Sequence, residues 1–287
     1  MNDHTIVCSF AEDLIEKLSQ ETLVVRTDDS SLVTVIKNVT DRNTRLQTIL
    51  LEPDEPLSSV AFMEDWEEIP IALYAPEFGS FREFIHKLPV LRKLKLKVFL
   101  STDNQQNYIH LRILSSLGIR CGIIFGENLV DWDLINDLMH YALYSKSNHA
   151  PIEPFQYIAS NYRPDKYTDY SSVYFDNPSK YLHMNKKEQI SLSRNELEEG
   201  KFIAEGVGSL NSISEIKEYK KRVLSWQEFL LQKKGCAYCP AFRVCIGKFS
   251  SSCEKNPGCR DFFTDVMDAA DYFQMQKKKS RRELWQS

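Results

Sequence analysis

Five of the seven cysteines in this chain are concentrated near its C-terminus. They are Cys236, Cys239, Cys245, Cys253 and Cys259, in the pattern C-x2-C-x5-C-x7-C-x5-C. Two thiolates separated by two residues can face one metal ion or cluster, because a tight turn brings both sulfurs to the same side. Buried thiolates carry negative charge that a bound metal neutralises in the protein interior. The spacing therefore favours metal binding over a disulfide set or unligated core cysteines.

The same segment bears on the choice between zinc and iron–sulfur. A zinc ribbon prefers two paired knuckles of the C-x2-C or C-x-C type, and this segment has one such pair. The pair is followed by Pro240 and by mostly apolar residues over 241–246, which suit a water-shielded cluster. The spacing favours an iron–sulfur cluster, with zinc as the alternative. The isolated Cys8 and Cys121 are expected to be small core residues.

Composition restricts the partners and the compartment. The chain has 287 residues, 43% of them apolar, with a formal net charge of -4, which gives no reason to expect nucleic acid as a partner. No apolar run approaches the roughly 18 residues of a membrane span. The N-terminus lacks a basic region followed by an apolar stretch, so no secretory signal is visible. These features predict a cytoplasmic location, where clustered cysteines are more often ligands than disulfides.

The first 150 residues alternate strand-like and helix-like patterns. Buried strands are predicted at Leu23–Arg26, Ile69–Ala75, Leu96–Leu100 and Ile119–Phe125. Amphipathic helices are predicted over 81–91, over 109–117 with Gly118 closing it, and over 131–144. Alternation of this kind predicts an α/β fold with a parallel sheet and right-handed crossovers. The pattern is compatible with both an open sheet and a partial barrel.

Composition changes after residue 150 predict three further regions. Residues 151–234 are expected to complete the scaffold, with short strands at Val173–Phe175 and Lys201–Ala204, a polar loop at Asn185–Gly200, and a helix from Asn211 to Leu231 that Gly235 ends. Residues 235–276 form the cysteine-rich segment, with a short helix over 261–276. The basic stretch 277–287 is expected to be a solvated tail.

The cysteine segment carries a family resemblance. GCAYCPAFRVCIGKF (235–249) and GCRDFF (258–263) resemble the SPASM domain that ends many radical-SAM peptide-modifying enzymes. The resemblance implies that Cys236, Cys239, Cys245 and Cys259 hold one auxiliary 4Fe–4S cluster. Phe249 stands where that family has a ligand of a second cluster, so only one cluster is implied. Cys253 is either a substitute ligand for Cys259 or an exposed free thiol.

The chain departs from that family at the catalytic cluster. Radical-SAM enzymes hold it with C-x3-C-x2-C on the loop after the first barrel strand, and this sequence has no such motif. No S-adenosylmethionine cluster is therefore expected, and the βα region is compatible with a partial barrel that has lost this loop. The chain most resembles the SPASM-domain peptide maturases of grasp-with-spasm cassettes, which implies a precursor peptide and an ATP-grasp ligase as partners. The alternatives are a non-catalytic peptide-binding scaffold and a zinc-stabilised α/β protein.

Overall fold

The computed structural model describes residues 4–41, 44–126, 130–210, 216–232, 234–249 and 258–284. The chain divides into two units, one made of Met1–Leu100 and Tyr174–Gln227 and the other of Ser101–Val173 and Glu228–Ser287. Each unit is assembled from two separate stretches of sequence. The predicted division at residues 150, 234 and 276 instead follows changes in composition along the chain.

The first unit is built on a mainly parallel sheet, which agrees with the predicted α/β class. Its strands are β1 (Thr5–Ser9), β2 (Thr22–Thr27), β3 (Arg45–Leu51), β4 (Ile71–Ala75), β5 (Leu96–Ser101), β8 (Tyr181–Met184), β9 (Gln189–Ser191) and β10 (Ala204–Glu205). Their order is β10-β9-β8-β1-β2-β3-β4-β5. The strands from β8 to β5 pair in parallel, and β9 and β10 add an antiparallel edge.

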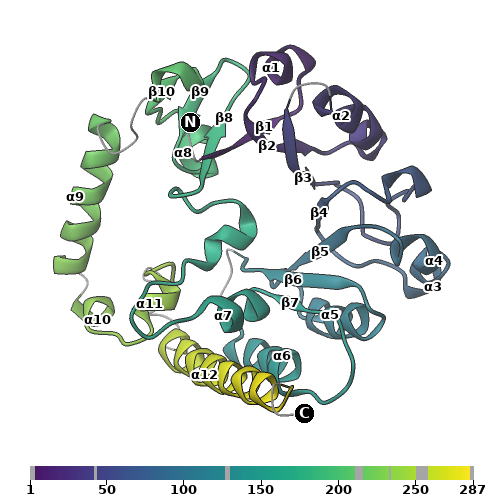
Figure 1. The fold of residues 1–287 in the computed structure, drawn as a ribbon, viewed down its shortest axis with the longest axis vertical. Helices are drawn as coiled ribbons and strands as arrows, with labels where there is room; N and C mark the ends of the chain where they lie inside the picture. Colours follow the sequence, from purple (N-terminus) through teal and green to yellow (C-terminus); the bar gives the residue numbers. More distant parts are fainter. Residues whose placement is uncertain are drawn as a thin grey trace. The chain divides into compact units, whose positions relative to one another are not determined.

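The strands form because apolar side chains dominate both faces of this sheet. Cys8 pairs in register with Val25 and Met184, and all three are fully buried. Parallel strands buried on both faces read as such continuous apolar runs. Helices follow the strands in βα order, and Figure 1 shows the first four along one side of the sheet. The helices of this unit are α1 (Glu12–Lys17), α2 (Val33–Thr40), α3 (Phe81–Ile85), α4 (Leu88–Leu91), α8 (Arg194–Glu198) and the start of α9 (Lys217–Gln232).

The connection after β1 is very short. It consists of Phe10 and Ala11, because β1 ends at Ser9 and α1 begins at Glu12. The Phe10 N–H donates a hydrogen bond of 2.9 Å to the Arg26 carbonyl at the end of β2. Neither residue of this connection is a cysteine.

The second unit is mainly helical. Its elements are α5 (Gln106–Ser116), β6 (Arg120–Ile124), α6 (Trp132–Tyr144), β7 (Ile152–Glu153), α7 (Phe155–Asn161), a 3₁₀ helix (Tyr170–Tyr174), α10 (Lys234–Ala237), α11 (Phe242–Cys245) and α12 (Cys259–Leu284). Gly118, at φ 84°, ends α5, and the Asp131 carboxylate caps α6 by accepting from the Leu134 N–H at 3.1 Å. Both helix ends agree with the sequence patterns.

Several predicted elements were wrong. The strand predicted at Val173–Phe175 is replaced by the 3₁₀ helix that ends at Tyr174, and the helix predicted over 81–91 is split into α3 and α4. Pro89 lies in the first turn of α4, where its missing N–H costs nothing. Gly235 does not end a helix but lies within α10 with no left-handed φ.

The region after residue 184 also differs from its prediction. The polar loop predicted at Asn185–Gly200 contains β9 and α8, and the strand predicted at Lys201–Ala204 begins only at Ala204. Ile190 and Leu192 are buried within this polar sequence, and the Ser193 side chain caps α8. The start of the helix predicted from Asn211 lies outside the described residues, and its described part is α9. The last helix, α12, is longer than predicted. Among the helices that the structure describes, none has both the length and the apolar character needed to cross a bilayer.

Candidate metal centre and a polar cluster

Three of the four predicted ligands lie on helices of the second unit, and the fourth lies in the turn after one of them. Cys236 is in α10, Cys239 follows that helix, Cys245 is the last residue of α11 and Cys259 is the first residue of α12. None of them forms a disulfide with another described cysteine. Cys253, the predicted substitute ligand, lies outside the described residues.

Cys236 and Cys239 share one turn. The Cys239 N–H donates a 3.1 Å hydrogen bond to the Cys236 carbonyl, and the Phe242 N–H donates to the Cys239 carbonyl at 3.0 Å, which leads directly into α11. Both cysteines are partly exposed. The turn leaves both side chains accessible to a ligand from solvent.

Cys245 is buried and lies beside a strained backbone turn. Ile246 (φ 50°) and Gly247 (φ 72°) both adopt left-handed conformations directly after α11. Burial raises the pKa of the Cys245 thiol, whereas hydrogen bonds from the backbone amides of Phe249, Gly247 and Lys248 lower it. Successive amides that point toward one atom form an anion-binding concavity. These amides offset part of the effect of burial, which still leaves the pKa of the Cys245 thiol above its usual value.

Cys259 is buried at the start of α12, and the residue before it explains its position. A Cβ atom on Gly258 would lie 2.4 Å from Cδ1 of Trp132, so only glycine allows the chain to pass this ring. The Phe262 N–H donates to the Gly258 carbonyl at 3.0 Å and completes the first turn of the helix. Trp132 of α6 thus fixes where α12 begins.

The described thiols do not make a closed ligand set. Cys236 is close enough to Cys245 to affect its titration. Among the residues that the structure describes, however, no three His, Cys, Asp or Glu side chains are grouped so that they could hold one metal ion. The donor chemistry fits a thiolate-bound metal, because one sulfur already accepts backbone amides of the kind that tune cluster ligands. The assignment of four ligands stays a prediction.

A pocket of about 290 Å³ lies beside Cys239. Its lining combines Cys239 with the cationic side chains of Lys166 and Arg243 and the rings of Tyr167 and Phe242. The Arg243 guanidinium donates to the Pro164 carbonyl, and the Arg243 carbonyl accepts from the Thr168 N–H at 2.9 Å. These bonds hold α11 against residues 164–168 and give the pocket two fixed walls.

Phe249 is a core residue. Its ring centroid lies 5.0 Å from that of Phe125, 5.1 Å from that of Trp132 and 5.7 Å from that of Phe263. Edge-to-face and tilted pairs of this kind add to the stabilisation that burial provides. Phe249 therefore joins the cysteine-rich segment to the aromatic core of its unit.

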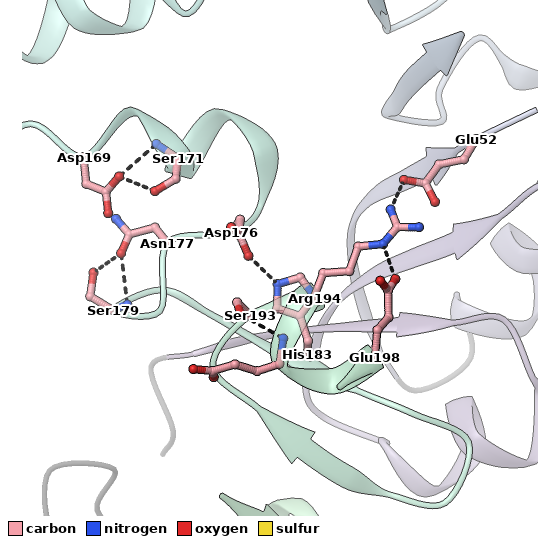
Figure 2. Close-up of polar contacts among 11 residues, drawn as sticks. Glu52, Asp169, Ser171, Asp176, Asn177, Ser179, His183, Ser193, Arg194 and Glu198 are labelled. Atoms are coloured by element: carbon pink, nitrogen blue, oxygen red, sulfur yellow. Dashed lines mark hydrogen bonds and ion pairs between the residues drawn. The ribbon is translucent and has the colours of Figure 1, made fainter. Parts of the chain in front are cut away.

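A polar cluster in the first unit was missed by the sequence reasoning. Arg194, in α8, donates from Nη1 to Glu52 Oε1 at 2.6 Å and from Nε to Glu198 Oε1 at 2.9 Å (Figure 2). Beside it, Nε2 of His183 lies 3.4 Å from Oδ1 of Asp176 (Figure 2). These residues come from stretches far apart in the sequence, and they meet where parallel strands end.

The position of this cluster follows from strand register. His183 on β8 pairs with Val7, and Arg26 on β2 pairs with Ser9, two residues further along β1. Residues two apart on a strand point to the same face, so His183 and Arg26 share one face of the sheet. The only sequence signal was the presence of charged residues, Arg26 and Glu52, at the ends of predicted or adjacent apolar runs.

Comparisons with protein-family models, with curated proteins and with solved structures found no match to this chain.

Proposed function

We propose that this protein takes part in the maturation of a ribosomally synthesised peptide, as a SPASM-like protein with one 4Fe–4S cluster. Cys236, Cys239, Cys245 and Cys259 would hold the cluster. A separate peptide-modifying enzyme, an ATP-grasp ligase, would act with it on the precursor peptide. The parallel sheet would then be a partial barrel of the radical-SAM type that lacks its catalytic loop.

The observation that carries the cluster assignment is the environment of Cys245. Backbone amides offset part of the effect of burial on this thiol, whose pKa is still raised, and a bound metal would supply the remaining stabilisation of a thiolate. Hydrogen bonds to sulfur and shielding from water are the features with which proteins tune iron–sulfur clusters. The aromatic rings packed around Phe249 supply apolar shielding in the same unit.

The protein's own residues limit the role of the cluster. The two-residue connection after β1 offers no cysteine, so we do not assign radical chemistry on S-adenosylmethionine to this chain. When bound, the cluster would supply structural cross-linking and a redox centre. Cys239, partly exposed at the pocket with Lys166 and Arg243, is the ligand beside which a peptide could dock.

Iron and acid-labile sulfide analysis of anaerobically purified full-length protein tests the cluster. We expect iron and sulfide in equal amounts. We also expect a broad visible absorption band that decreases when dithionite reduces the cluster. Zinc without sulfide would overturn the cluster and leave the zinc-stabilised α/β protein as the function class.

A second candidate is a non-catalytic scaffold that presents the peptide to the ligase. The short connection after β1 favours this candidate, because it removes the only loop on which the family holds a catalytic cluster. Incubation of the precursor peptide with this protein, with the ligase, and with both would separate the two roles. A change in peptide mass with this protein alone would reject the scaffold.

A further inference from the structure

The polar cluster of the first unit contains buried groups that have no hydrogen-bond partner. Among the described residues none bonds to Nε of Arg26, the hydroxyl of Tyr74, Oδ1 of Asp176 or either ring nitrogen of His183. His183 and Asp176 approach to 3.4 Å but are not aligned for a hydrogen bond. Buried polar atoms in native proteins are nearly always bonded, so a group of orphans requires an explanation.

Two of these unbonded groups, Arg26 and Tyr74, are influenced by charged residues of the same cluster. The pKa of Arg26 is lowered, first by burial and then by the charge of Arg194. The pKa of Tyr74 is raised, first by burial and then by the carboxylates of Glu52 and Asp176. The charges of Glu52 and Arg194 act on both side chains. They lie at the carboxyl ends of parallel strands, the edge at which open α/β sheets bind ligands.

Arg26 is the group that most needs a partner. Its Nη2 makes a long contact of 3.4 Å to the Ser9 hydroxyl, and it forms no ion pair with a described carboxylate. The charges of Glu52 and Glu198 act on Arg26, but both carboxylates are bonded to Arg194. A half-buried guanidinium with no carboxylate bonded directly to it is costly, and a planar carboxylate is the ligand that matches its geometry.

The cluster is open on its outer side. The side chains of Asp176 and Arg194 are 42% and 44% exposed, whereas that of His183 is 4% exposed. Solvent can reach the outer groups, and the inner donors lie behind them. This gradient is expected of a site that a small molecule enters from the rim.

We propose that this cluster is a binding site for a small carboxylate-bearing ligand. Arg26 anchors the carboxylate through its Nε–H and adjacent Nη2–H groups. Tyr74 and the His183–Asp176 pair bond the remaining polar atoms of the ligand. The site lies entirely in the first unit and does not depend on the metal centre or on the proposed function.

The test uses two matched probes on the full-length protein: N-acetylglycine, which has a carboxylate, and N-acetylglycinamide, which has a neutral amide instead. The Nε–H resonance of Arg26 in a ¹⁵N-labelled sample is identified by its disappearance in Arg26→Gln. We expect N-acetylglycine to shift this resonance saturably and N-acetylglycinamide to leave it in place. An equal response to both probes, or no response to N-acetylglycine, would overturn the proposal.

Variants separate binding from folding. Binding in the variants is followed by saturable shifts of backbone amide resonances, because Arg26→Gln lacks the Nε–H group. Arg26→Gln should weaken N-acetylglycine binding about tenfold or more, because a charge-assisted bidentate contact is lost. Arg45→Gln changes an exposed arginine at the opposite end of a neighbouring strand and should bind as the wild type does. Tyr74→Phe removes an unbonded hydroxyl, so binding should weaken several-fold while the melting temperature does not fall. Unaltered binding in both Arg26→Gln and Tyr74→Phe would reject the site.

Discussion

The cysteines in strands and those in the C-terminal segment of this protein differ in the backbone groups that surround them. Cys8 in β1 and Cys121 in β6 are fully buried, and burial raises the pKa of both thiols, that of Cys8 to about 12. The Cys121 thiol donates to the Leu111 carbonyl at 3.4 Å, as a protonated sulfur does. Cys245 is buried as well, but several backbone amides donate to its sulfur. One backbone hydrogen bond acts on Cys121 and three act on Cys245, and burial outweighs them at both thiols, whose pKa values stay raised.

The largest expected effect separates the two groups by metal content. Cys239→Ser should reduce bound metal at least about tenfold and lower the melting temperature, because a lost ligand opens the site. Cys8→Ser should lose stability but keep its metal, since Cys8 lies in the sheet of the other unit. Elemental analysis and thermal unfolding of both variants provide the comparison. If both variants lost metal, or neither did, the C-terminal cysteines would not differ from Cys8 in metal binding.

Alkaline pH should act on the strand cysteines. Folding raises the pKa of Cys8 from 9.0 to about 12, so the folded state holds this proton more tightly than the unfolded state. Its contribution to stability is complete below about pH 9 and is lost as the pH rises toward 12, amounting to about 4 kcal/mol at most. Cys121 and Tyr74 have the same direction of shift.

Urea unfolding at about pH 7.5 and about pH 10.5 measures this loss. In Cys8→Ala the drop in unfolding free energy between the two pH values should be smaller than in the wild type. An equal drop would show that the Cys8 thiol is not the group that titrates.

Substitution of Phe249 tests whether this residue stabilises the fold through its packing. Phe249→Cys supplies the missing sulfur but removes a ring packed against Phe125 and Trp132, and should cost about 3 kcal/mol. Phe81→Cys is the matched control, because Phe81 is 46% exposed and should change little. Chemical unfolding and iron analysis of the two variants test this. A gain of iron in Phe249→Cys without loss of stability would contradict the packing role.

The smallest effect concerns the turn after Cys245. Gly247→Ala forces a Cβ into a left-handed conformation at φ 72° and should cost about 1–2 kcal/mol, with weaker metal binding. Gly208→Ala is the control, because nothing lies within 4 Å of its added Cβ and its φ is not left-handed. Competition with a chelator compares metal affinity in the two variants. Equal affinities would mean that the amide arrangement does not support the ligand.

Much of the fold could be predicted because local patterns and tertiary packing agree there. The apolar run Leu96–Leu100 lies in β5, and Gly118 and Asp131 end and begin helices as their residue types predict. The Val173–Phe175 prediction failed because apolar side chains suit a buried 3₁₀ turn as well as a strand. The Asn185–Gly200 prediction failed because Ile190 and Leu192 are buried there by contacts that a polar neighbourhood conceals.

The candidate metal centre and the polar cluster differ in how much of each could be predicted from the sequence. The cysteine spacing is local, so the candidate ligands were visible. The amides that face Cys245 also depend on the left-handed φ of Ile246, which its residue type does not predict. The polar cluster depends on the pairing of β8 with β1, which brings His183 toward the end of β2 from more than half the chain away. Long-range register of this kind has no signature in a single sequence.

The two-residue connection between β1 and α1 has a consequence for engineering and for descent. The cysteine motif of a radical-SAM enzyme is longer than the whole connection, and the Phe10 N–H is already bonded to the second strand. Point substitutions therefore cannot graft that chemistry onto this scaffold, since a loop must first be inserted. If, as we propose, the scaffold is related to such an enzyme, the two differ in the length of this loop, which a single substitution would not restore.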